Sequence, residues 1–194
     1  MKKQEKVLRL CIMAMLTALS VVLIAVIRFP IFPPPADFLE YDPADIPVLI
    51  GAMMLGPIPG ILILFVASAI QAITVSSVNG IIGFFMHFIA SSALVLVSSL
   101  IYRKKKTIPS LIIGLVLGTL AMVVVMIPLN LIFIPPLVEM TAGIQITAKD
   151  VAAMIVPTII PFNLIKAGVN SAITFAVFTP IAHVLKKYIK VGKK

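Results

Sequence analysis

Long apolar runs separated by short polar or proline-rich breaks occupy most of the chain. The first run covers residues 8–27, and two others cover residues 81–102 and 109–134, the last ending before Pro135 and Pro136. A helix rises about 1.5 Å per residue, so each run can cross a hydrocarbon core of about 30 Å. The pattern predicts transmembrane helices, with lipid as the solvent for most of the chain.

Two further apolar segments are separated by a turn. Residues 46–55 are too few to cross the membrane as a straight helix, and the motif GPIPG follows at residues 56–60. We predict a short second helix over residues 46–55 going in and a third helix over residues 61–74 coming out. Neighbouring helices should shield both, because short or broken segments need protein around their backbone.

The last apolar run, residues 151–185, is too long for one helix perpendicular to the bilayer. Pro157 and Pro161 divide it. We therefore expect a short outer piece before Pro161 and a sixth membrane helix over residues 161–187. The preceding segment, residues 137–150, should lie outside and contain a turn of helix.

Composition supports a membrane protein. Of the 194 residues, 61% are hydrophobic and 12% are charged, and the mean hydropathy is +1.18. Soluble domains are roughly half apolar and a quarter charged. This composition excludes a soluble protein, and the length predicts a single domain over residues 1–194.

The basic residues lie in three groups. Thirteen of the 16 Lys and Arg are Lys2, Lys3, Lys6, Arg9, Arg103, Lys104, Lys105, Lys106, Lys186, Lys187, Lys190, Lys193 and Lys194. Cytoplasmic segments carry an excess of Lys and Arg. The pattern thus predicts an all-α membrane protein with six transmembrane helices, both termini cytoplasmic, and a long first outer loop over residues 28–45. It also explains the net charge of +9 without nucleic-acid binding, which would favour aromatics among basic residues on a solvated face.

Motifs of common enzymes are absent from the sequence. There is no GxxxxGK[ST] phosphate loop, no HExxH and no GxSxG, which excludes P-loop ATP hydrolysis and the most recognisable protease and hydrolase sites. The single cysteine, Cys11, excludes an intramolecular disulfide and a cysteine-based metal site. We therefore predict a protein that is not an enzyme and holds no metal or cofactor.

Three polar residues share one face of the predicted sixth helix. Asn163, Lys166 and Asn170 have the i, i+3, i+7 spacing of a helix face. An ionisable side chain in an apolar run costs about 2.5–3.5 kcal/mol on insertion scales unless it finds partners or a water-filled cavity. Lys166 could snorkel to the outer interface instead, but two asparagines on the same face favour a polar cavity.

Asn130 should lie at a similar depth, near the outer end of the fifth helix. The order of the helices brings it with Asn163 and Lys166 beneath the first outer loop, which carries Glu40 and Tyr41. Amides and an ammonium suit a ligand rich in carbonyls, ring nitrogens or hydroxyls. For Asn130 alone, an interhelical hydrogen bond is an equal alternative.

Other residues give weaker signals. His87 should lie in the fourth helix, where a lone histidine is more often a packed, hydrogen-bonded residue than a ligand. Asp42 and Asp45 are expected to be solvated loop charges, or to start a turn and cap the second helix. Ala14 and Ala18 form a small-xxx-small pattern that permits close contact with a membrane partner.

Several motifs together resemble a transporter family. The segment LEYDPADIPVLI at residues 39–50, the GPIPG turn, Asn130, and PFNLIK at residues 161–166 resemble the riboflavin-specific substrate-binding (S) component of energy-coupling factor (ECF) transporters. The likeness covers essentially the whole chain. The segment HFIA at residues 87–90 resembles the family's NFIA region, with His87 in place of asparagine.

The resemblance implies a six-helix protein of a bacterial-type cell membrane that binds riboflavin from outside, under the cap of the first outer loop. Uptake would require a transmembrane coupling (T) protein and two cytoplasmic ATPases. The first helix would dock through the motif formed by Ala14 and Ala18. The candidate substrate-binding residues are Asn130, Asn163, Lys166, Glu40, Tyr41, Asn170 and His87.

Three alternatives stay open. The cargo could be another vitamin or a flavin derivative such as FMN, although a phosphate favours more cations near the site than Arg28 and Lys149. A self-sufficient secondary transporter coupled to protons or sodium usually buries a carboxylate at mid-membrane, whereas the acids here lie in loops or at the N-terminus. A purely structural subunit gives no reason for Asn163 and Lys166 to share a face.

Overall fold

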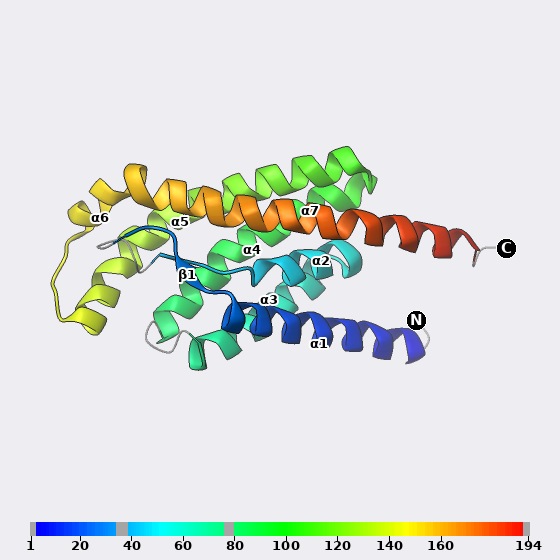
Figure 1. Cartoon of the computed structure of the whole chain (residues 1–194), viewed down its shortest axis with the longest axis horizontal. Coiled ribbons are helices and arrows are strands. Elements are labelled where there is room, and N and C mark those ends of the chain that lie inside the picture. Colours follow the sequence, from blue (N-terminus) through cyan, green and yellow to red (C-terminus); the bar gives the residue numbers. More distant parts are fainter. Residues whose placement is uncertain (1–2, 34–38, 76–79, 192–194) are drawn as a thin grey trace.

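Helices account for nearly all of the protein, for which a computed structural model describes residues 3–33, 39–75 and 80–191, with side chains up to His183 (Figure 1). The elements are α1 (Lys3–Val26), β1 (Phe29–Pro30), β2 (Glu40–Tyr41), α2 (Asp45–Leu55), α3 (Pro57–Ile73), α4 (Gly80–Lys105), α5 (Ile108–Ala142), α6 (Ala148–Met154), the π-helical turn η1 (Ile155–Ile159) and α7 (Ile160–Val191). Lys2, Lys193 and Lys194 of the predicted basic groups lie outside the described residues.

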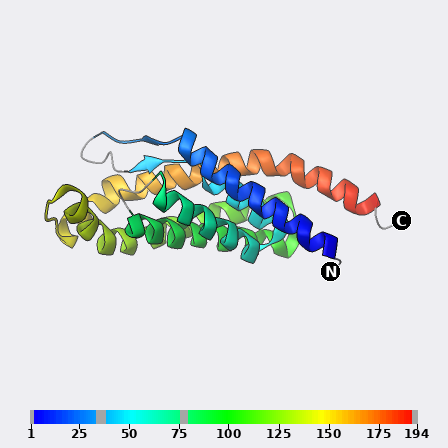
Figure 2. The same ribbon diagram turned by 90° about the horizontal axis from the view of Figure 1, so that it is seen from below.

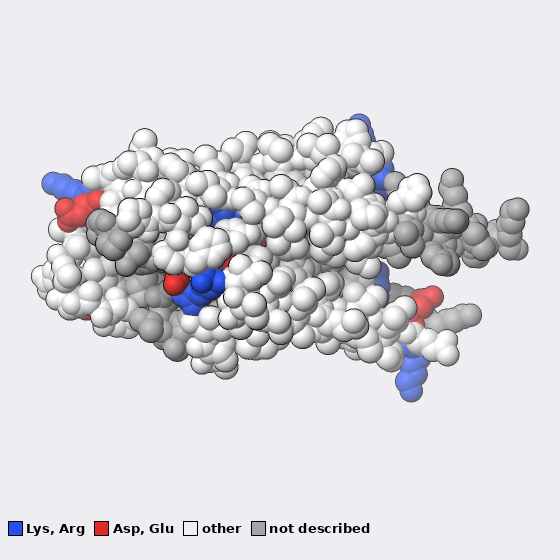
Figure 3. Space-filling model, in the orientation of Figure 1, with Lys and Arg blue, Asp and Glu red and all other residues white. Residues whose placement is uncertain are grey.

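The surface is that of a membrane protein. Four helical stretches are long and apolar enough to cross a bilayer: Lys3–Val26, Gly80–Lys105, Ile108–Ala142 and Ala148–His183. The apolar helices α2 and α3 are shorter. On the face seen in Figure 3, the charged residues that are described gather at the two ends of the long axis and in one cluster between them, and the white surface between these groups is uncharged.

The short helix α2 lies at the centre of the bundle. Nine of its 11 residues are buried, and it contacts α1, α3, α4 and α7. A helix that is apolar on all sides is stable when neighbours cover it. The prediction of a short second helix shielded by its neighbours is confirmed.

The first loop contains a small hairpin that the sequence did not predict. Strands β1 and β2 pair antiparallel, with Phe29 opposite Tyr41 and Pro30 opposite Glu40. In Figures 1 and 2 the hairpin lies away from the end of the long axis where α1 starts and α7 finishes. The pairing satisfies backbone groups of a proline-rich segment and holds β2 against the bundle.

The break between α2 and α3 is shorter than expected. Gly56 has a φ of +114°, which residues with a side chain rarely adopt, and Pro57 already occupies the first turn of α3. Proline fits there because the N–H it lacks would have no partner in the helix. The predicted start of the third helix at residue 61 is therefore too late.

The prediction that the fifth helix ends before Pro135 is wrong. Helix α5 continues through Pro128, Pro135 and Pro136 and ends at Gly143, which caps it with a φ of +67°. Each proline removes one hydrogen bond from the helix. The loss is local, because the residues beyond the prolines again donate backbone hydrogen bonds within the helix, up to the cap at Gly143. Part of the expected outer segment 137–150 is consequently helical.

The last apolar run is divided as predicted, but without a sharp break. Helix α6 passes into η1, a π-helical turn around Pro157, and α7 begins at Ile160 beside the expected start at Pro161. A π-helical turn widens the spacing of the backbone hydrogen bonds and so accommodates a residue that cannot donate one. The candidate residues of α7 follow directly after this turn.

Helices α2 and α3 approach so closely at Gly60 that a side chain there has no room. A Cβ at Gly60 would lie 2.5 Å from the Cβ and 2.9 Å from the Cα of Ala52, so Gly60→Ala should lower the free energy of unfolding by about 1–3 kcal/mol. A Cβ at Gly168 would meet no described atom within 4 Å, and Gly168→Ala is the matched control, expected to be neutral or slightly stabilising. Thermal unfolding in detergent measures both, and equal midpoints would contradict the tight contact.

Candidate substrate-binding site

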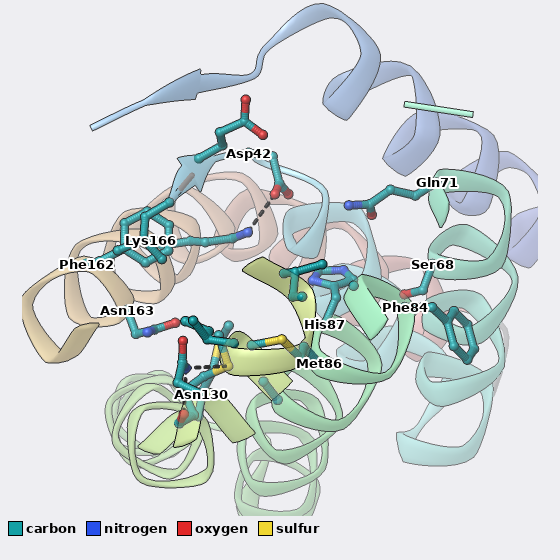
Figure 4. Close-up of a pocket in the computed structure, with 18 of the residues that line it drawn as sticks. Asp42, Ser68, Gln71, Phe84, Met86, His87, Asn130, Phe162, Asn163 and Lys166 are labelled. Atoms are coloured by element: carbon teal, nitrogen blue, oxygen red, sulfur yellow. Dashed lines mark hydrogen bonds and ion pairs between the residues drawn. The ribbon is translucent and has the colours of Figure 1, made fainter. Parts of the chain in front are cut away.

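A pocket lies between the first loop and helices α3, α4, α5 and α7 (Figure 4). The empty space inside it, including the open mouth, is about 910 Å³. The polar residues that line it are Arg28, Glu40, Asp42, Ser68, Gln71, His87, Asn130, Asn163 and Lys166. Apolar lining residues include Leu39, Ala72, Phe84, Met86, Met122, Met126, Ile134, Leu137 and Phe162.

Lys166 and Asp42 form a buried ion pair between α7 and the first loop. The Nζ of Lys166 lies 2.6 Å from Oδ2 of Asp42, and the two residues are 8% and 4% exposed (Figure 4). A buried ammonium requires an anion, and the loop supplies it. The expectation that Asp42 is a solvated loop charge is wrong. Lys166 does not snorkel to the interface but lines a polar pocket with Asn163, as the asparagines on its face favoured.

The surroundings of Asp42 favour its charged form. Burial raises the pKa of the Asp42 carboxyl, but the Lys166 ammonium, His87 and the Ala44 N–H together outweigh burial and hold the pKa below that of an ordinary aspartate. Oδ1 of Asp42 accepts the backbone N–H of Ala44 at 3.1 Å. This side-chain bond starts the turn into α2, so the predicted turn at Asp42 is confirmed.

Asn170 and Tyr41 hold the first loop from behind the pocket. Nδ2 of Asn170 donates to the backbone carbonyl of Asp42 at 3.0 Å, and the hydroxyl of Tyr41 donates to Oδ1 of Asn170 at 3.0 Å. Ser20 of α1 adds another bond by donating to the carbonyl of Ala44 at 2.7 Å. Asn170 and Tyr41 are buried and lie outside the set that lines the pocket.

Asn130 and Asn163 each present an amide oxygen that accepts no hydrogen bond from the residues that the structure describes. Their Nδ2 atoms donate to carbonyls one turn earlier in the same helix, at 2.6 Å to Met126 and 2.8 Å to Ile159. Their Oδ1 atoms are buried and accept no hydrogen bond within the described part of the chain. Both residues line the pocket with Lys166, which confirms the convergence expected from the order of the helices.

Glu40 lies at the mouth of the pocket and is held by Arg28. The Arg28 guanidinium forms an ion pair with the Glu40 carboxylate and donates to the carbonyl of Val75. It thereby links the hairpin to the residues that follow α3. Sequence reasoning missed Arg28 as a site residue, although a cation directly before a proline-rich acidic loop was a visible signal.

His87 forms part of the α4 wall, next to Asp45. Nε2 of His87 lies 4.0 Å from Oδ1 of Asp45, which is 0% exposed. Asp45 makes no side-chain cap bond, so the expectation that it is a solvated charge or a cap is wrong. It is buried because it begins α2, the helix at the centre of the bundle. Among the described residues, no three His, Cys, Asp or Glu side chains form a potential metal site.

An aromatic cluster of α3 and α4 lies beside the pocket and reaches it through one ring. Phe84 lines the pocket and stacks on Phe88, with ring planes 2° apart and centroids 5.8 Å apart, and Phe65 of α3 meets both edge-on. Phe65 and Phe88 are not among the residues that line the pocket, so of this cluster Phe84 is the ring that a bound flat ring system could contact. The sequence places the two phenylalanines at i and i+4, but apolar residues are so common in a membrane helix that this spacing did not stand out.

Ala14 and Ala18 lie on the exposed face of α1 and do not line the substrate pocket. They line a shallow apolar groove between α1 and α3, with Thr17, Leu62 and Val66 among the other lining residues. Their small side chains leave the α1 backbone open to close approach.

The sequence is similar to that of membrane transport proteins over most of its length. The family described as ECF transporter, substrate-specific component, matches residues 8–178. The chain belongs to this family. The resemblance inferred from the motifs is confirmed, and the protein is a substrate-binding component of a transporter rather than an enzyme.

Named relatives and a solved structure agree with this assignment. The Riboflavin transporter RibU of Staphylococcus aureus (strain TCH60) is 34% identical over 180 residues, 92% of this chain and 93% of that protein. The Riboflavin transporter FmnP of Bacillus subtilis (strain 168) is 31% identical over 177 residues, 89% and 91% of the two chains. A solved S component of a bacterial ECF transporter superposes with a TM-score of 0.78 at 32% identity, covering 95% of this chain and 99% of that one.

The buried pair of Asp42 and Lys166 should behave as a unit. Either Asp42→Asn or Lys166→Met should cost about 3–5 kcal/mol, because each leaves its partner buried and unpaired. The double variant should lose less than the sum of the two. Thermal unfolding of the four proteins in detergent measures the coupling, and additive losses would contradict it.

The stability that the pair of Asp42 and Lys166 contributes should depend on pH, with a sign set by the pKa of Asp42. The folded pKa of Asp42 lies below its ordinary value, so the contribution of the pair is present above about pH 4 and is lost as the pH falls through the folded pKa. The unfolding midpoints of the wild type and the double variant should run parallel from about pH 5 to pH 8 and converge only in more acidic buffer.

Proposed function

We propose that this protein binds riboflavin from outside the cell and delivers it as the substrate-binding subunit of an ATP-driven ECF transporter. The observation that carries the proposal is the pair of unpartnered Oδ1 atoms of Asn130 and Asn163 in a pocket of a chain whose relatives are named riboflavin transporters. A buried amide oxygen without a donor costs free energy. These two atoms are therefore suited to accept N–H or O–H groups from a ligand.

The chemistry of riboflavin matches the pocket. Its flat ring system has carbonyls and ring nitrogens along one edge and carries a chain of hydroxyls. The flat rings suit the apolar lining residues, which include Phe84 and Phe162, and the polar edge suits Asn130, Asn163 and Lys166. Lys166 has three N–H donors, so it can keep its bond to Asp42 and still donate to a ligand carbonyl.

The other candidate residues take different parts in this proposal. Glu40 at the mouth accepts a hydroxyl of the ligand, and His87 forms the wall on α4. Tyr41 and Asn170 act through the loop, because their hydrogen bonds hold the segment that carries Asp42. No metal or cofactor is required for binding of this kind.

A different cargo is the first alternative. For FMN, the phosphate needs cations, and the cations that line the pocket among the described residues are Lys166 and Arg28, which are paired with Asp42 and Glu40. The charges of the site therefore favour a neutral ligand over a phosphorylated one. Another neutral vitamin is distinguished from riboflavin by competition for the same site.

An ion-coupled secondary transporter is the second alternative, and one observation favours it. Asp45 is a fully buried carboxylate next to the pocket, which is the kind of group that binds a coupling ion. Such a protein would accumulate substrate alone, without ATP. Dependence of uptake on ATPase partners separates the two functions.

We infer that six helices cross the bacterial cell membrane, with both termini in the cytoplasm. The start of α1 and the end of α7 lie at the same end of the bundle (Figure 1). The basic groups of the sequence mark that end as cytoplasmic. With α2 and α3 crossing as shorter, shielded helices, the pocket opens toward the outside.

Energy for uptake must come from partners. The proposed partners are a transmembrane T protein and two cytoplasmic ATPases, in keeping with the family of the chain. Ala14 and Ala18 on the exposed face of α1 offer the surface on which the T protein docks, because small residues allow helices to approach closely in lipid.

Riboflavin should bind the detergent-purified protein at one site per chain. The bound vitamin should appear as a co-purifying yellow chromophore or as saturable quenching of its fluorescence on titration. Asn163→Ala should weaken binding about tenfold, which corresponds to about 1.4 kcal/mol and falls within the cost of losing a hydrogen-bond partner.

Thr174→Ala is the matched control for this titration. Thr174 is a buried polar residue of α7 that lies outside the pocket lining, so its loss should leave the affinity unchanged. A colourless protein that does not quench riboflavin would leave the family assignment intact and remove this vitamin as the substrate.

Docking is tested by enlarging the exposed face of α1. The double variant Ala14→Leu, Ala18→Leu should bind riboflavin normally and lose ATP-dependent uptake in proteoliposomes that contain the T protein and ATPases. Met15→Leu, an exposed change on the same helix, is the control and should keep uptake. Uptake that persists without ATP or partners would favour the ion-coupled alternative.

A further inference from the structure

Ser68 carries a buried hydroxyl group in the wall of the pocket. The residue is 1% exposed, and its Oγ has no hydrogen-bond partner within the described part of the chain. Among the described residues that line the pocket, it is the one with a hydroxyl. Burying a hydroxyl without a partner costs free energy, so a bound molecule that supplies the missing bond recovers this cost.

The hydroxyl of Ser68 differs from others in the helices of this protein. Thr17 on α1 donates to the carbonyl of Met13 one turn earlier, at 2.9 Å. Thr74, at the end of α3 itself, donates to the carbonyl of Ile70 at 2.6 Å. Such bonds to the preceding turn are the usual way in which a helix satisfies a hydroxyl. Ser68 makes no bond of this kind, so its hydroxyl can still both donate and accept.

Ser68 continues the inner face of α3. Gly60, Leu64 and Ser68 follow one another at intervals of four residues, and all three are buried. At Gly60 this face packs closely against Ala52 of α2. At Ser68, and at Gln71 one turn further toward the end of the helix, the same face lines the pocket. The inner face of α3 thus changes along its length from a packing surface to part of the binding site.

The mouth of the pocket lies over the same end of α3. Arg28 donates to the carbonyl of Val75, just after this helix, and pairs with Glu40. Val75 follows Gln71 by about one turn and Ser68 by about two. Glu40, Gln71 and Ser68 therefore form a series of polar groups that runs from the mouth inward along α3, which we call the α3 column.

The α3 column lies across the pocket from the polar residues of α7. In Figure 4, Ser68 and Gln71 come from α3 on one side, and Asn163 and Lys166 come from α7 on the other. The pocket consequently has two separate polar sides. A ligand that satisfies both must carry polar groups on two different parts of its structure.

We propose that Ser68 binds the hydroxyl chain of the substrate, and that the α3 column selects for a flat ring system that carries such a chain. The proposal rests on the proposed function, because it concerns how the same pocket recognises its substrate. Each hydroxyl of the chain can donate and accept, as the serine hydroxyl can. A chain of consecutive hydroxyls also suits a series of polar groups at successive depths.

The shape of riboflavin requires two polar sides. Its carbonyls lie on a terminal ring, whereas its hydroxyl chain branches from the central ring. The residues that bind one part therefore cannot also bind the other. Asn163 and Lys166 suit the terminal ring, the apolar lining residues Phe84 and Met86 suit the ring faces, and the α3 column remains for the chain.

The test compares two flavins on the variant Ser68→Ala. Lumiflavin has the same ring system as riboflavin, with a methyl group in place of the hydroxyl chain. The dissociation constant of riboflavin should rise about three- to tenfold in the variant, which is the usual effect of losing one neutral hydrogen bond. The dissociation constant of lumiflavin should be the same for the variant and the wild type. Quenching of flavin fluorescence measures riboflavin directly and lumiflavin directly or by competition.

Ser98→Ala is the matched control. Ser98 is also a fully buried serine whose hydroxyl has no partner among the described residues, but it lies outside the pocket lining, and its loss should change neither affinity. An unchanged riboflavin affinity in Ser68→Ala overturns the proposal. An equal loss for both flavins also overturns it, because Ser68 would then shape the pocket without binding the chain. A wild type that binds neither flavin overturns the proposed function as well, so the two failures are distinguishable.

Thermal unfolding in detergent gives a second test that does not depend on lumiflavin. Without ligand, Ser68→Ala should unfold at the midpoint of the wild type or above it, because alanine removes a buried hydroxyl that has no partner. At one fixed concentration of riboflavin, the midpoint should rise less in the variant than in the wild type. A ligand-free midpoint well below that of the wild type, or equal rises with riboflavin, would overturn the proposal.

Discussion

A buried ammonium group requires an anion, and this requirement fixes the outer half of the molecule. Lys166 lies on α7, which lines the pocket, and Asp42 lies on the first loop, which covers it. Their 2.6 Å contact therefore joins α7 to the loop. Asn170 and Tyr41 add hydrogen bonds along the same joint. Helix α7 both lines the pocket and anchors the first loop. Neither α7 nor the loop can therefore move far without breaking the buried pair of Lys166 and Asp42, which costs several kcal/mol.

Lipid explains why the polar residues gather where they do. Apolar side chains cover the outside at no cost in a bilayer, so hydrophobic burial does little to organise the interior. Polar groups are driven inward and toward one another, because each one facing lipid carries a penalty. The amides of Asn130 and Asn163 use their N–H groups on their own helices and keep an oxygen each, which leaves a cavity suited to binding.

The sequence predicted the helices and the residues that line the pocket better than it predicted the loop. Apolar runs gave most of the long helices, and spacing gave the face shared by Asn163 and Lys166. It failed at Pro135 and Pro136, since a proline removes only its own hydrogen bond and the residues beyond it continue α5 to the glycine cap at Gly143. It also failed at Asp42 and Asp45, because no local pattern shows that a loop acid will meet a cation 124 residues away.

The burial of these two acids bears on how transport is driven. In an ion-coupled transporter, the carboxylate that binds the coupling ion on one side of the membrane must release it on the other side. Asp42 is held ionised by Lys166, so it is a poor carrier of a proton. Asp45 is fully buried, and a carboxylate that binds a coupling ion from the outer side must also release it inside before any work is done. The site of this chain therefore accounts for capture of the substrate, and the energy for its release is expected from the ATPases of the ECF complex.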